Sequence, residues 1–270
     1  MTEPLYRAVV EGFKGIFAVL GMKLNIVGEE NIPLQGGAVL ALNHTSYLDF
    51  ALGGVPADRR GRRFVRFMAK DSVFRHPIAG PLMRGMKHIP VDRHDGSVAF
   101  ETAVAAARAG ELIGVFPEAT MSRSLEIKEL KNGSVRMARE AEVPLIPMIV
   151  FGGHRVLSYD VRDFTRGRTI CMTIGRPMTI NDDVDEMAGL SAAFEGADAC
   201  VLLSAAHADF TPGSMATAVQ DTLDVNAEKL VTGTTFHQQA AAAYERAARA
   251  AALSGLGGVS VRVPPAAGAA

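Results

Sequence analysis

His44 and Asp49 are the first residues of this sequence whose types and spacing could do chemistry. A carboxylate about one helical turn from a histidine can accept the hydrogen of one imidazole nitrogen, which fixes the tautomer and leaves the other nitrogen free to take a proton. The pair is therefore a candidate general base. No obvious nucleophile stands beside it, so we expect the hydroxyl that loses the proton to belong to a substrate. The pair alone is a weak signal, because a surface histidine and a helix-capping Asp produce the same spacing by chance.

Three further segments combine polar residues or prolines with apolar stretches, at 87–93, 115–124 and 143–147. The first ends in Asp92-Arg93, and an arginine there can hold a phosphate through its planar guanidinium fork. The second follows an apolar run with a carboxylate, hydroxyls and a cation, among them Glu118, Thr120 and Arg123. The third, Val-Pro-Leu-Ile-Pro, leads into another apolar run. Taken singly, they are better explained as a surface ion pair, a helix N-cap and the entry to a buried strand.

In this order and spacing, the four segments resemble the four blocks of the glycerolipid acyltransferase family, which contains 1-acylglycerol-3-phosphate and glycerol-3-phosphate acyltransferases. The first block of that family reads N-H-x-x-x-x-D, which Asn43, His44 and Asp49 match. The second ends in an apolar residue followed by Asp-Arg, as residues 89–93 do. The fourth reads Val-Pro-apolar-apolar-Pro, as residues 143–147 do. Lys70 lies in a stretch that resembles the K…F…P…G pattern common in the family. The resemblance covers roughly residues 27–177.

The third block departs from the usual F-P-E-G-T-R-S of the family. This chain has Ala119 where glycine is usual and Met121 where arginine is usual. Arg123 follows two residues later and could supply the missing cation. The block resembles a variant found in actinobacterial members, which reads F-P-E-A-T-x-S-R-S. The resemblance therefore indicates the type of reaction more firmly than the identity of the acceptor.

The resemblance implies that a fatty acyl group moves from acyl-CoA or acyl-carrier protein to the hydroxyl of 1-acylglycerol 3-phosphate, a step of phospholipid synthesis. Asp49 would orient His44, and His44 would take the proton of the acceptor hydroxyl. The implied substrate-binding residues are Lys70, Arg93, Glu118, Thr120 and Arg123. The cations would hold the acceptor phosphate, and Glu118 would bind the glycerol hydroxyl or organise those cations. We expect no metal and no cofactor besides the acyl donor as co-substrate, since the remaining histidines show no metal-ligand spacing.

Three alternatives stay open at this stage. The acceptor could be glycerol 3-phosphate or another lysolipid. The same base could activate water, as in a thioesterase, although a hydrolase has no need for the phosphate-binding Arg93. A non-catalytic lipid-binding protein is a third reading, but binding alone does not require the poised base of His44 and Asp49.

The elements that must position these residues follow from the spacing of apolar residues. Strand candidates lie at 38–42, 64–69, 112–116, 145–151 and 169–174, and helical patterns lie at 46–52, 78–86, 97–109 and 132–142. This alternation predicts an α/β fold, with a mostly parallel sheet flanked by helices. The resemblance implies the glycerol-3-phosphate acyltransferase-like form of that fold. Because sites in such sheets form at the carboxyl ends of strands, His44 and Glu118 should open on the same edge.

We divide the chain into four parts, an N-terminal amphipathic helix at 1–24, an acyltransferase core at 25–180, a C-terminal helical segment at 181–253 and a poorly ordered tail at 254–270. The net charge of −1 argues against nucleic-acid binding. Cys171 and Cys200 give neither a metal spacing nor a disulfide framework, which fits a reducing cytoplasm.

The N-terminal helix carries an apolar face made by Leu5, Val9, Phe13, Ile16 and Leu20. The helix could pack on the domain's own core or lie in a membrane interface, and the sequence leaves both open. The arginine-rich segment 59–66 could attract anionic head groups or be a solvated loop. We expect no secretory signal, and no run approaches the roughly 20 apolar residues of a spanning helix. With a lysophospholipid acceptor, we expect a peripheral protein on the cytoplasmic face of the cell membrane.

Overall fold

The computed structural model describes residues 3–92, 94–122, 130–159 and 161–180, and every structural statement below concerns these residues. The expected helical segment at 181–253 and the expected tail at 254–270 lie outside them. The first half of the fold comprises α1 (Pro4–Val19), β1 (Lys23–Val27), η1 (Glu29–Asn31), β2 (Ala38–Leu42), α2 (Asp49–Gly61), β3 (Val65–Lys70), α3 (Asp71–Phe74) and α4 (Ala79–Gly85). The second half comprises β4 (Ile89–Val91), α5 (Ser97–Arg108), β5 (Leu112–Val115), α6 (Gly133–Ala141), β6 (Leu145–Phe151), η2 (Gly153–Arg155) and β7 (Thr169–Ile174).

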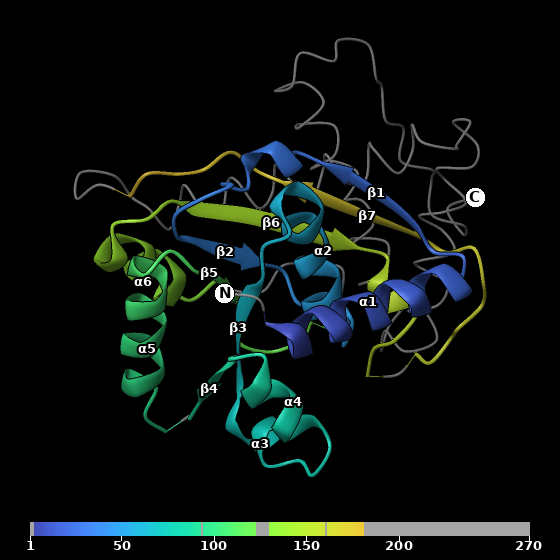
Figure 1. Cartoon of the computed structure of the whole chain (residues 1–270), viewed down its shortest axis with the longest axis horizontal. Helices are drawn as coiled ribbons and strands as arrows, with labels where there is room; N and C mark the ends of the chain where they lie inside the picture. The colour runs from blue at the N-terminus through green and yellow to red at the C-terminus, as the bar shows by residue number, and fades with distance from the viewer. Residues whose placement is uncertain (1–2, 93, 123–129, 160, 181–270) are drawn as a thin grey trace, which may run out of the picture.

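The strands form one seven-stranded sheet in the order β1-β7-β6-β2-β5-β3-β4 (Figure 1). Every neighbouring pair is parallel except β6 and β7. The predicted α/β fold with a mostly parallel, helix-flanked sheet is therefore confirmed, and all five predicted strands are present within one residue of their expected ends. β1 and β4 were not predicted. Both are short strands at the edges of the sheet, and neither is buried along its whole length, so neither leaves a continuous apolar run.

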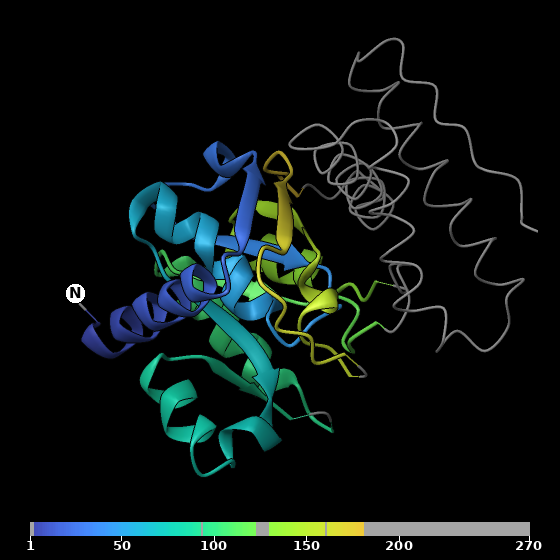
Figure 2. The ribbon, with the colours of Figure 1, turned by 90° about the vertical axis from the view of Figure 1, so that its right-hand side faces the viewer.

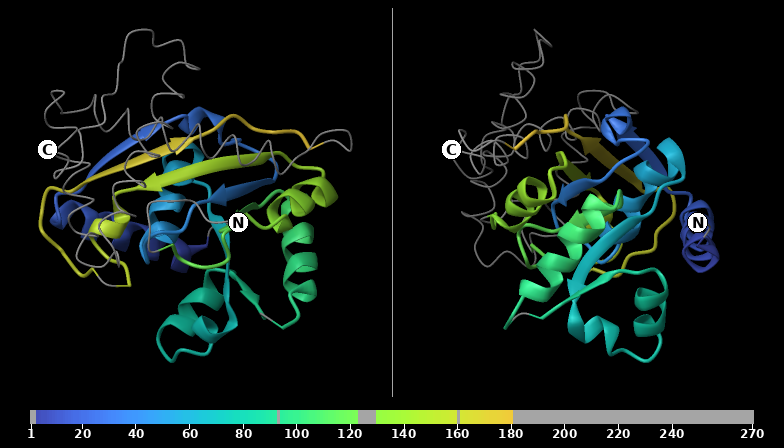
Figure 3. Two further views of the ribbon diagram at one scale, coloured as in Figure 1. Left: turned by 180° about the vertical axis from the view of Figure 1, so that it is seen from behind. Right: turned by 60° about the vertical axis from the view of Figure 1, so that its left-hand side comes forward.

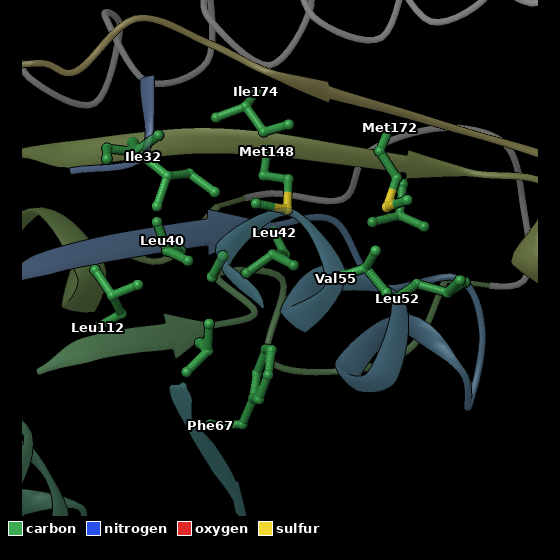
Figure 4. Close-up of a cluster of buried hydrophobic side chains, with 14 of the residues drawn as sticks. Ile32, Leu40, Leu42, Leu52, Val55, Phe67, Leu112, Met148, Met172 and Ile174 are labelled. Carbon is green, nitrogen blue, oxygen red and sulfur yellow. The ribbon is translucent and has the colours of Figure 1, made fainter. Parts of the chain in front are cut away.

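Helices cover both faces of the sheet (Figures 2 and 3). The central strand β2 is fully buried along its whole length. Val39 and Ala41 of β2 pack with α5 and α6, whereas Leu40 and Leu42 pack on the other face with α1 and α2. Figure 4 shows the second of these clusters, in which Leu42 lies among side chains from β6, α2 and β3. A strand buried on both faces is apolar throughout instead of alternating, which explains why the sequence revealed it.

The helix after β2 differs from its prediction. The pattern indicated residues 46–52, but α2 runs from Asp49 to Gly61. Two glycines and Pro56 follow Leu52 and would end an isolated helix. Here the helix continues because its buried face contributes Leu52 and Val55 to the core. Gly53 has no room for a side chain, because Leu42 of β2 lies directly against it.

The N-terminal helix α1 has two apolar faces instead of the single predicted one. Its inner face packs on the domain. Tyr6 donates a hydrogen bond to the carbonyl of Val65 at 2.6 Å, and the ring of Phe13 lies 5.5 Å from that of Phe50. Arg7 and Lys14 both form ion pairs with the buried carboxylate of Asp58. The outer face leaves Leu5 41% exposed and Ile16 52% exposed. Residues of the predicted face therefore divide between core and surface, and no helix in the described residues is long and apolar enough to span a membrane.

The arginine-rich segment 59–66 also contributes to the fold. Arg63 donates hydrogen bonds to the carbonyls of Pro33, Gly36 and Gly110, so it holds together the loops that precede β2 and β5. Arg66 is buried and pairs with Glu3 at 2.6 Å and with Glu111 at 3.3 Å. Both guanidinium groups therefore bond to groups of this same chain.

Candidate active site

The candidate site lies at the carboxyl edge of the three parallel strands β2, β5 and β3. His44 comes two residues after β2, Glu118 comes three residues after β5, and Lys70 is the last residue of β3. Because the strands are parallel and adjacent, their carboxyl ends meet at one edge. The expected opening of His44 and Glu118 on a common edge is confirmed.

His44 and Asp49 form a hydrogen-bonded pair. The imidazole Nδ1 lies 3.1 Å from the Asp49 Oδ2, and the carboxylate is fully buried. The same oxygen accepts the backbone N–H groups of Thr45 and Ser46, each at 2.7 Å. Burial raises the pKa of the Asp49 carboxyl, while His44 and the two backbone donors act in the opposite direction. With Nδ1 donating to the carboxylate, Nε2 is the imidazole nitrogen that can accept a proton.

Aromatic rings fix the plane of the His44 imidazole. Phe116, which follows β5, stacks on it with ring centroids 4.2 Å apart and planes 24° apart. Phe67 of β3 stacks behind Phe116 at 5.9 Å. A histidine held by a carboxylate at one nitrogen and by a ring on one face has little freedom to rotate. Sequence reasoning missed the role of Phe116, although its place directly after a buried strand could have suggested it.

The loop after β5 also clamps the backbone of His44. The N–H of His44 donates to the Glu118 Oε1 at 2.8 Å, and the carbonyl of His44 accepts the N–H of Ser122 at 2.6 Å. Glu118 is 4% exposed. Its carboxylate therefore supports the position of His44, a role that differs from the expected contact with a glycerol hydroxyl or with cations. That substrate role stays a prediction.

Asn43 anchors the end of β2 to the neighbouring strand. Its side-chain amide donates to the carbonyl of Val150 at 3.1 Å and accepts the N–H of the same residue at 2.8 Å. The amide thus continues the ladder between β2 and β6 for one more residue and sets where the chain turns toward His44. In the sequence, Asn43 stood out only as the first residue of the N-H-x-x-x-x-D pattern, and nothing there indicated this contact.

The other predicted site residues are less fully described. Lys70 and Thr120 are both exposed on the edge that carries His44. Arg93 and Arg123 lie outside the described residues, so the cluster of phosphate-binding cations stays a prediction. Within the described ranges, no group of His, Cys, Asp and Glu side chains is arranged to hold a metal ion. His88 and His154 are buried, and burial lowers their pKa values to about 4 and about 3, so both are neutral near pH 7.

The backbone conformation of Ala119 explains why glycine is the usual residue at this position. Its φ angle is 56°, in the left-handed region that costs a residue with a Cβ roughly 1–2 kcal/mol. The residue lies in the tight turn between Phe116 and Thr120, where the N–H of Ala119 bonds the carbonyl of Phe116 at 2.9 Å. This turn brings the Glu118 carboxylate to the backbone N–H of His44.

We expect Ala119→Gly to raise the free energy of unfolding by up to about 1 kcal/mol, because relief of the left-handed strain outweighs the roughly 0.5–1 kcal/mol entropic penalty of glycine. Urea unfolding at neutral pH measures the change. Glu142→Gly is the matched control, because Glu142 has φ 57° at the end of α6, away from His44, and should gain similarly. A loss of stability in Ala119→Gly alone would show that the alanine methyl makes contacts that offset the strain.

The sequence is similar to those of known acyltransferases. The family model described as Acyltransferase matches residues 23–151. The 1-acyl-sn-glycerol-3-phosphate acyltransferase of Bacillus subtilis is 28% identical over 147 residues, which cover 53% of this chain and 69% of that protein. The protein of the same name from Limnanthes douglasii is 28% identical over 185 residues, covering 66% of this chain and 61% of that protein. A probable 1-acyl-sn-glycerol-3-phosphate acyltransferase of Mycoplasma pneumoniae is 30% identical over 142 residues, and this chain spans about half its length, 53%.

A solved structure has the same fold. The crystal structure of the 1-acyl-sn-glycerophosphate (LPA) acyltransferase PlsC from Thermotoga maritima superimposes with a TM-score of 0.57 at 20% sequence identity. The match covers 72% of this chain and 78% of that chain. Taken with the family model, it supports the fold class inferred from the sheet order and the helices on both faces.

Proposed function

We propose that this protein transfers a fatty acyl group from a thioester donor to the hydroxyl of 1-acylglycerol 3-phosphate, a proposal that the match of residues 23–151 to the Acyltransferase family model supports. The His44–Asp49 pair carries the proposal. It is a histidine with one nitrogen tied to a buried carboxylate and the other free to act as a base, at the edge of the sheet where ligands bind. The acceptor is proposed because the relatives from Bacillus subtilis and Limnanthes douglasii are named for it.

The chemistry begins with a proton transfer. Nε2 of His44 takes the proton of the acceptor hydroxyl as its oxygen attacks the thioester carbonyl. The Asp49 carboxylate stabilises the imidazolium that forms. The tetrahedral intermediate then collapses, the carbon–sulfur bond breaks, and the imidazolium returns its proton to the departing thiolate. The products are the O-acyl ester and the free thiol, and His44 is regenerated.

The proposed acceptor carries a phosphate, and Arg93, Lys70 and Arg123 are the cations proposed to bind it. Lys70 stands exposed at the end of β3, on the same edge as His44. We expect Arg93→Ala to raise the KM for the phosphorylated acceptor about tenfold or more, because a charge-assisted guanidinium–phosphate pair contributes about 1.5–3 kcal/mol. The KM for the acyl donor should change much less. Steady-state kinetics with each substrate varied in turn make the measurement, and a change confined to the donor KM would move Arg93 to the donor site.

A panel of substrates separates the proposed acceptor from its alternatives. Purified protein is assayed with 1-acylglycerol 3-phosphate, glycerol 3-phosphate and lysophosphatidylcholine, each with acyl-CoA and with acyl-carrier protein as donor. The proposal expects 1-acylglycerol 3-phosphate to give the highest kcat/KM with at least one donor. A higher value with glycerol 3-phosphate or lysophosphatidylcholine would replace the acceptor and keep the reaction. The comparison of donors decides between the two thioesters.

The protein is further proposed to work as a peripheral protein on the cytoplasmic face of the membrane. The proposed acceptor and product are both lipids, so the site must exchange substrates with a bilayer. The exposed outer face of α1, with Leu5, Ile16 and Val19, is available for such a contact. The inner face, which includes Phe13, is engaged with the domain.

A further inference from the structure

The N-terminal end of α6 is open and has no capping group. The side chain of Asn132, which precedes the helix, makes no capping hydrogen bond, and the first turn contains no acidic residue. The N–H groups of Gly133 and Ser134 have no acceptor inside the helix, and they find none elsewhere among the described residues. Gly133 is partly exposed, and a side chain built there would meet nothing within 4 Å. We call residues 131–134 the α6 start.

Ser134 places a buried hydroxyl at this open end. The residue is 0% exposed, and its Oγ has no hydrogen-bond partner among the described residues. The Cα–Cβ bonds of an α-helix tilt toward its N-terminus, so the hydroxyl of this second helical residue leans toward the α6 start. A buried hydroxyl that bonds to no protein group is unfavourable, and it favours a ligand that can bond to it.

Two cations stand at the α6 start and directly after it. Lys131 is exposed, and Arg136 is exposed at the end of the first turn, with its guanidinium carbon 5.1 Å from the ring centroid of Phe100 on α5. Neither cation forms an ion pair with another described residue. The N-terminal end of a helix dipole is itself positive, so cations there add to its field instead of offsetting it. The α6 start therefore attracts an anion.

The α6 start lies at the edge of the sheet that carries the candidate site. The N–H of Lys131 donates to the carbonyl of Pro117 at 2.9 Å. The next residue, Glu118, accepts the backbone N–H of His44 at 2.8 Å. These two hydrogen bonds connect the α6 start to the residue proposed as the base.

Lys70 lies on the same face of the sheet as α6. It comes two residues after Met68 on β3, and Met68 packs against the cluster that α5 and α6 form with the sheet. Alternate residues of a strand point to the same face, so the Lys70 side chain leaves β3 on the side of α5 and α6. The α6 start and a cation proposed to bind the acceptor phosphate therefore share one face.

We propose that the α6 start is a phosphate-binding subsite. The N–H groups of Gly133 and Ser134 and the hydroxyl of Ser134 donate to phosphate oxygens, and Lys131 neutralises their charge. Which substrate carries the phosphate rests on the proposed function. The acceptor fits better than CoA, because its phosphate is on the carbon next to the reacting hydroxyl, whereas the pantetheine arm separates the phosphates of CoA from the thioester. The binding of phosphate itself does not require turnover.

Isothermal titration calorimetry tests the subsite without turnover. The full chain is titrated with inorganic phosphate and with glycerol 3-phosphate, and we expect both to bind. Asn132→Asp should weaken each Kd about tenfold or more, because the new carboxylate repels the phosphate and can accept the free N–H groups. The control is Gln35→Glu, the same change from amide to carboxylate at an exposed residue before β2, at the opposite edge of the sheet. It should bind as the unmodified chain does.

Ser134→Ala separates binding from a structural role. The Kd should weaken about tenfold, because a donor to a charged oxygen is lost. The midpoint of urea unfolding without phosphate should not fall, because the hydroxyl has no protein partner among the described residues. A lower midpoint with an unchanged Kd would show that the hydroxyl is purely structural and would remove it from the subsite.

Steady-state kinetics identify the substrate. A higher KM for 1-acylglycerol 3-phosphate in Asn132→Asp, with an unchanged KM for acyl-CoA, assigns the subsite to the acceptor, and the reverse result assigns it to the donor. Absence of phosphate binding in the unmodified chain, or equal binding by Asn132→Asp, would overturn the proposal. If the binding results hold and no acyl transfer occurs with any acceptor, the proposed function is wrong and the phosphate subsite stands.

Discussion

His44→Ala should lower the rate of acyl transfer by about 10²–10⁴-fold, the usual worth of general-base catalysis, while the protein remains folded. His44 lies beyond the end of β2 and its side chain is 23% exposed, so its removal opens no large core cavity. The structural losses are the stacking on Phe116, worth about 0.5–1.5 kcal/mol, and the hydrogen bond to the Asp49 carboxylate, which keeps its two backbone donors. Steady-state kinetics give the activity, and urea unfolding gives the stability. A folded variant that retained more than about a tenth of the original kcat would remove His44 from the role of base.

Asp49→Asn should cost at least about 10²-fold in kcat with little change in stability. The amide oxygen can still accept the N–H groups of Thr45 and Ser46, which now bond to the Asp49 Oδ2. That oxygen also keeps the Nδ1–H of His44, and the amide nitrogen takes the Oδ1 position, so what the imidazolium loses is the negative charge that stabilises it. An imidazole beside a neutral amide is a weaker base than one beside a carboxylate. Because burial raises the pKa of the Asp49 carboxyl, a neutral side chain of the same shape should be tolerated by the fold.

A double-mutant comparison separates the positioning role of Asp49 from a direct one. If Asp49 acts only through His44, Asp49→Asn should have almost no further effect on the residual rate of His44→Ala. Additive losses would show that the carboxylate contributes to the reaction independently of the imidazole. The unfolding free energies of the three variants, measured in parallel, exclude a loss of folded protein as the cause.

The core of the fold was predictable because it is buried on both faces of the sheet. β2, β5 and β6 are continuous apolar runs with almost no exposed residue, and such runs are visible in a single sequence. The length of α2 was not predictable, because local propensity at Pro56 opposes a helix that tertiary packing maintains. The two faces of α1 were merged in the prediction, because both are apolar and only the position of α2 distinguishes them.

The candidate site was predictable where its residues are close in sequence. His44 and Asp49 are five positions apart, and their hydrogen bond was expected from that spacing. The supports of His44 come from distant segments. The hydrogen bond from its backbone to Glu118 joins residues 74 positions apart, and that from Asn43 to Val150 joins residues 107 positions apart. Such pairings depend on the order of strands in the sheet, which the spacing of apolar residues does not determine.

The strained turn at Ala119 was predictable from the sequence only in part. The departure from the usual glycine was visible in the sequence, but its cost became clear only from the positive φ angle. The turn brings Glu118 to the backbone of His44, so a local substitution is linked to the placement of the proposed base.

The most direct test of the account is the release of thiol from acyl-CoA, or from acyl-carrier protein, with and without 1-acylglycerol 3-phosphate. A base that activates an acceptor hydroxyl should release thiol only when the acceptor is present, and each thiol should be matched by one molecule of diacylglycerol 3-phosphate. A base that activates water would release thiol and free fatty acid at the same rate without the acceptor. The account predicts acceptor-dependent release that His44→Ala abolishes. Acceptor-independent release, abolished by the same substitution, would contradict it and identify a thioesterase.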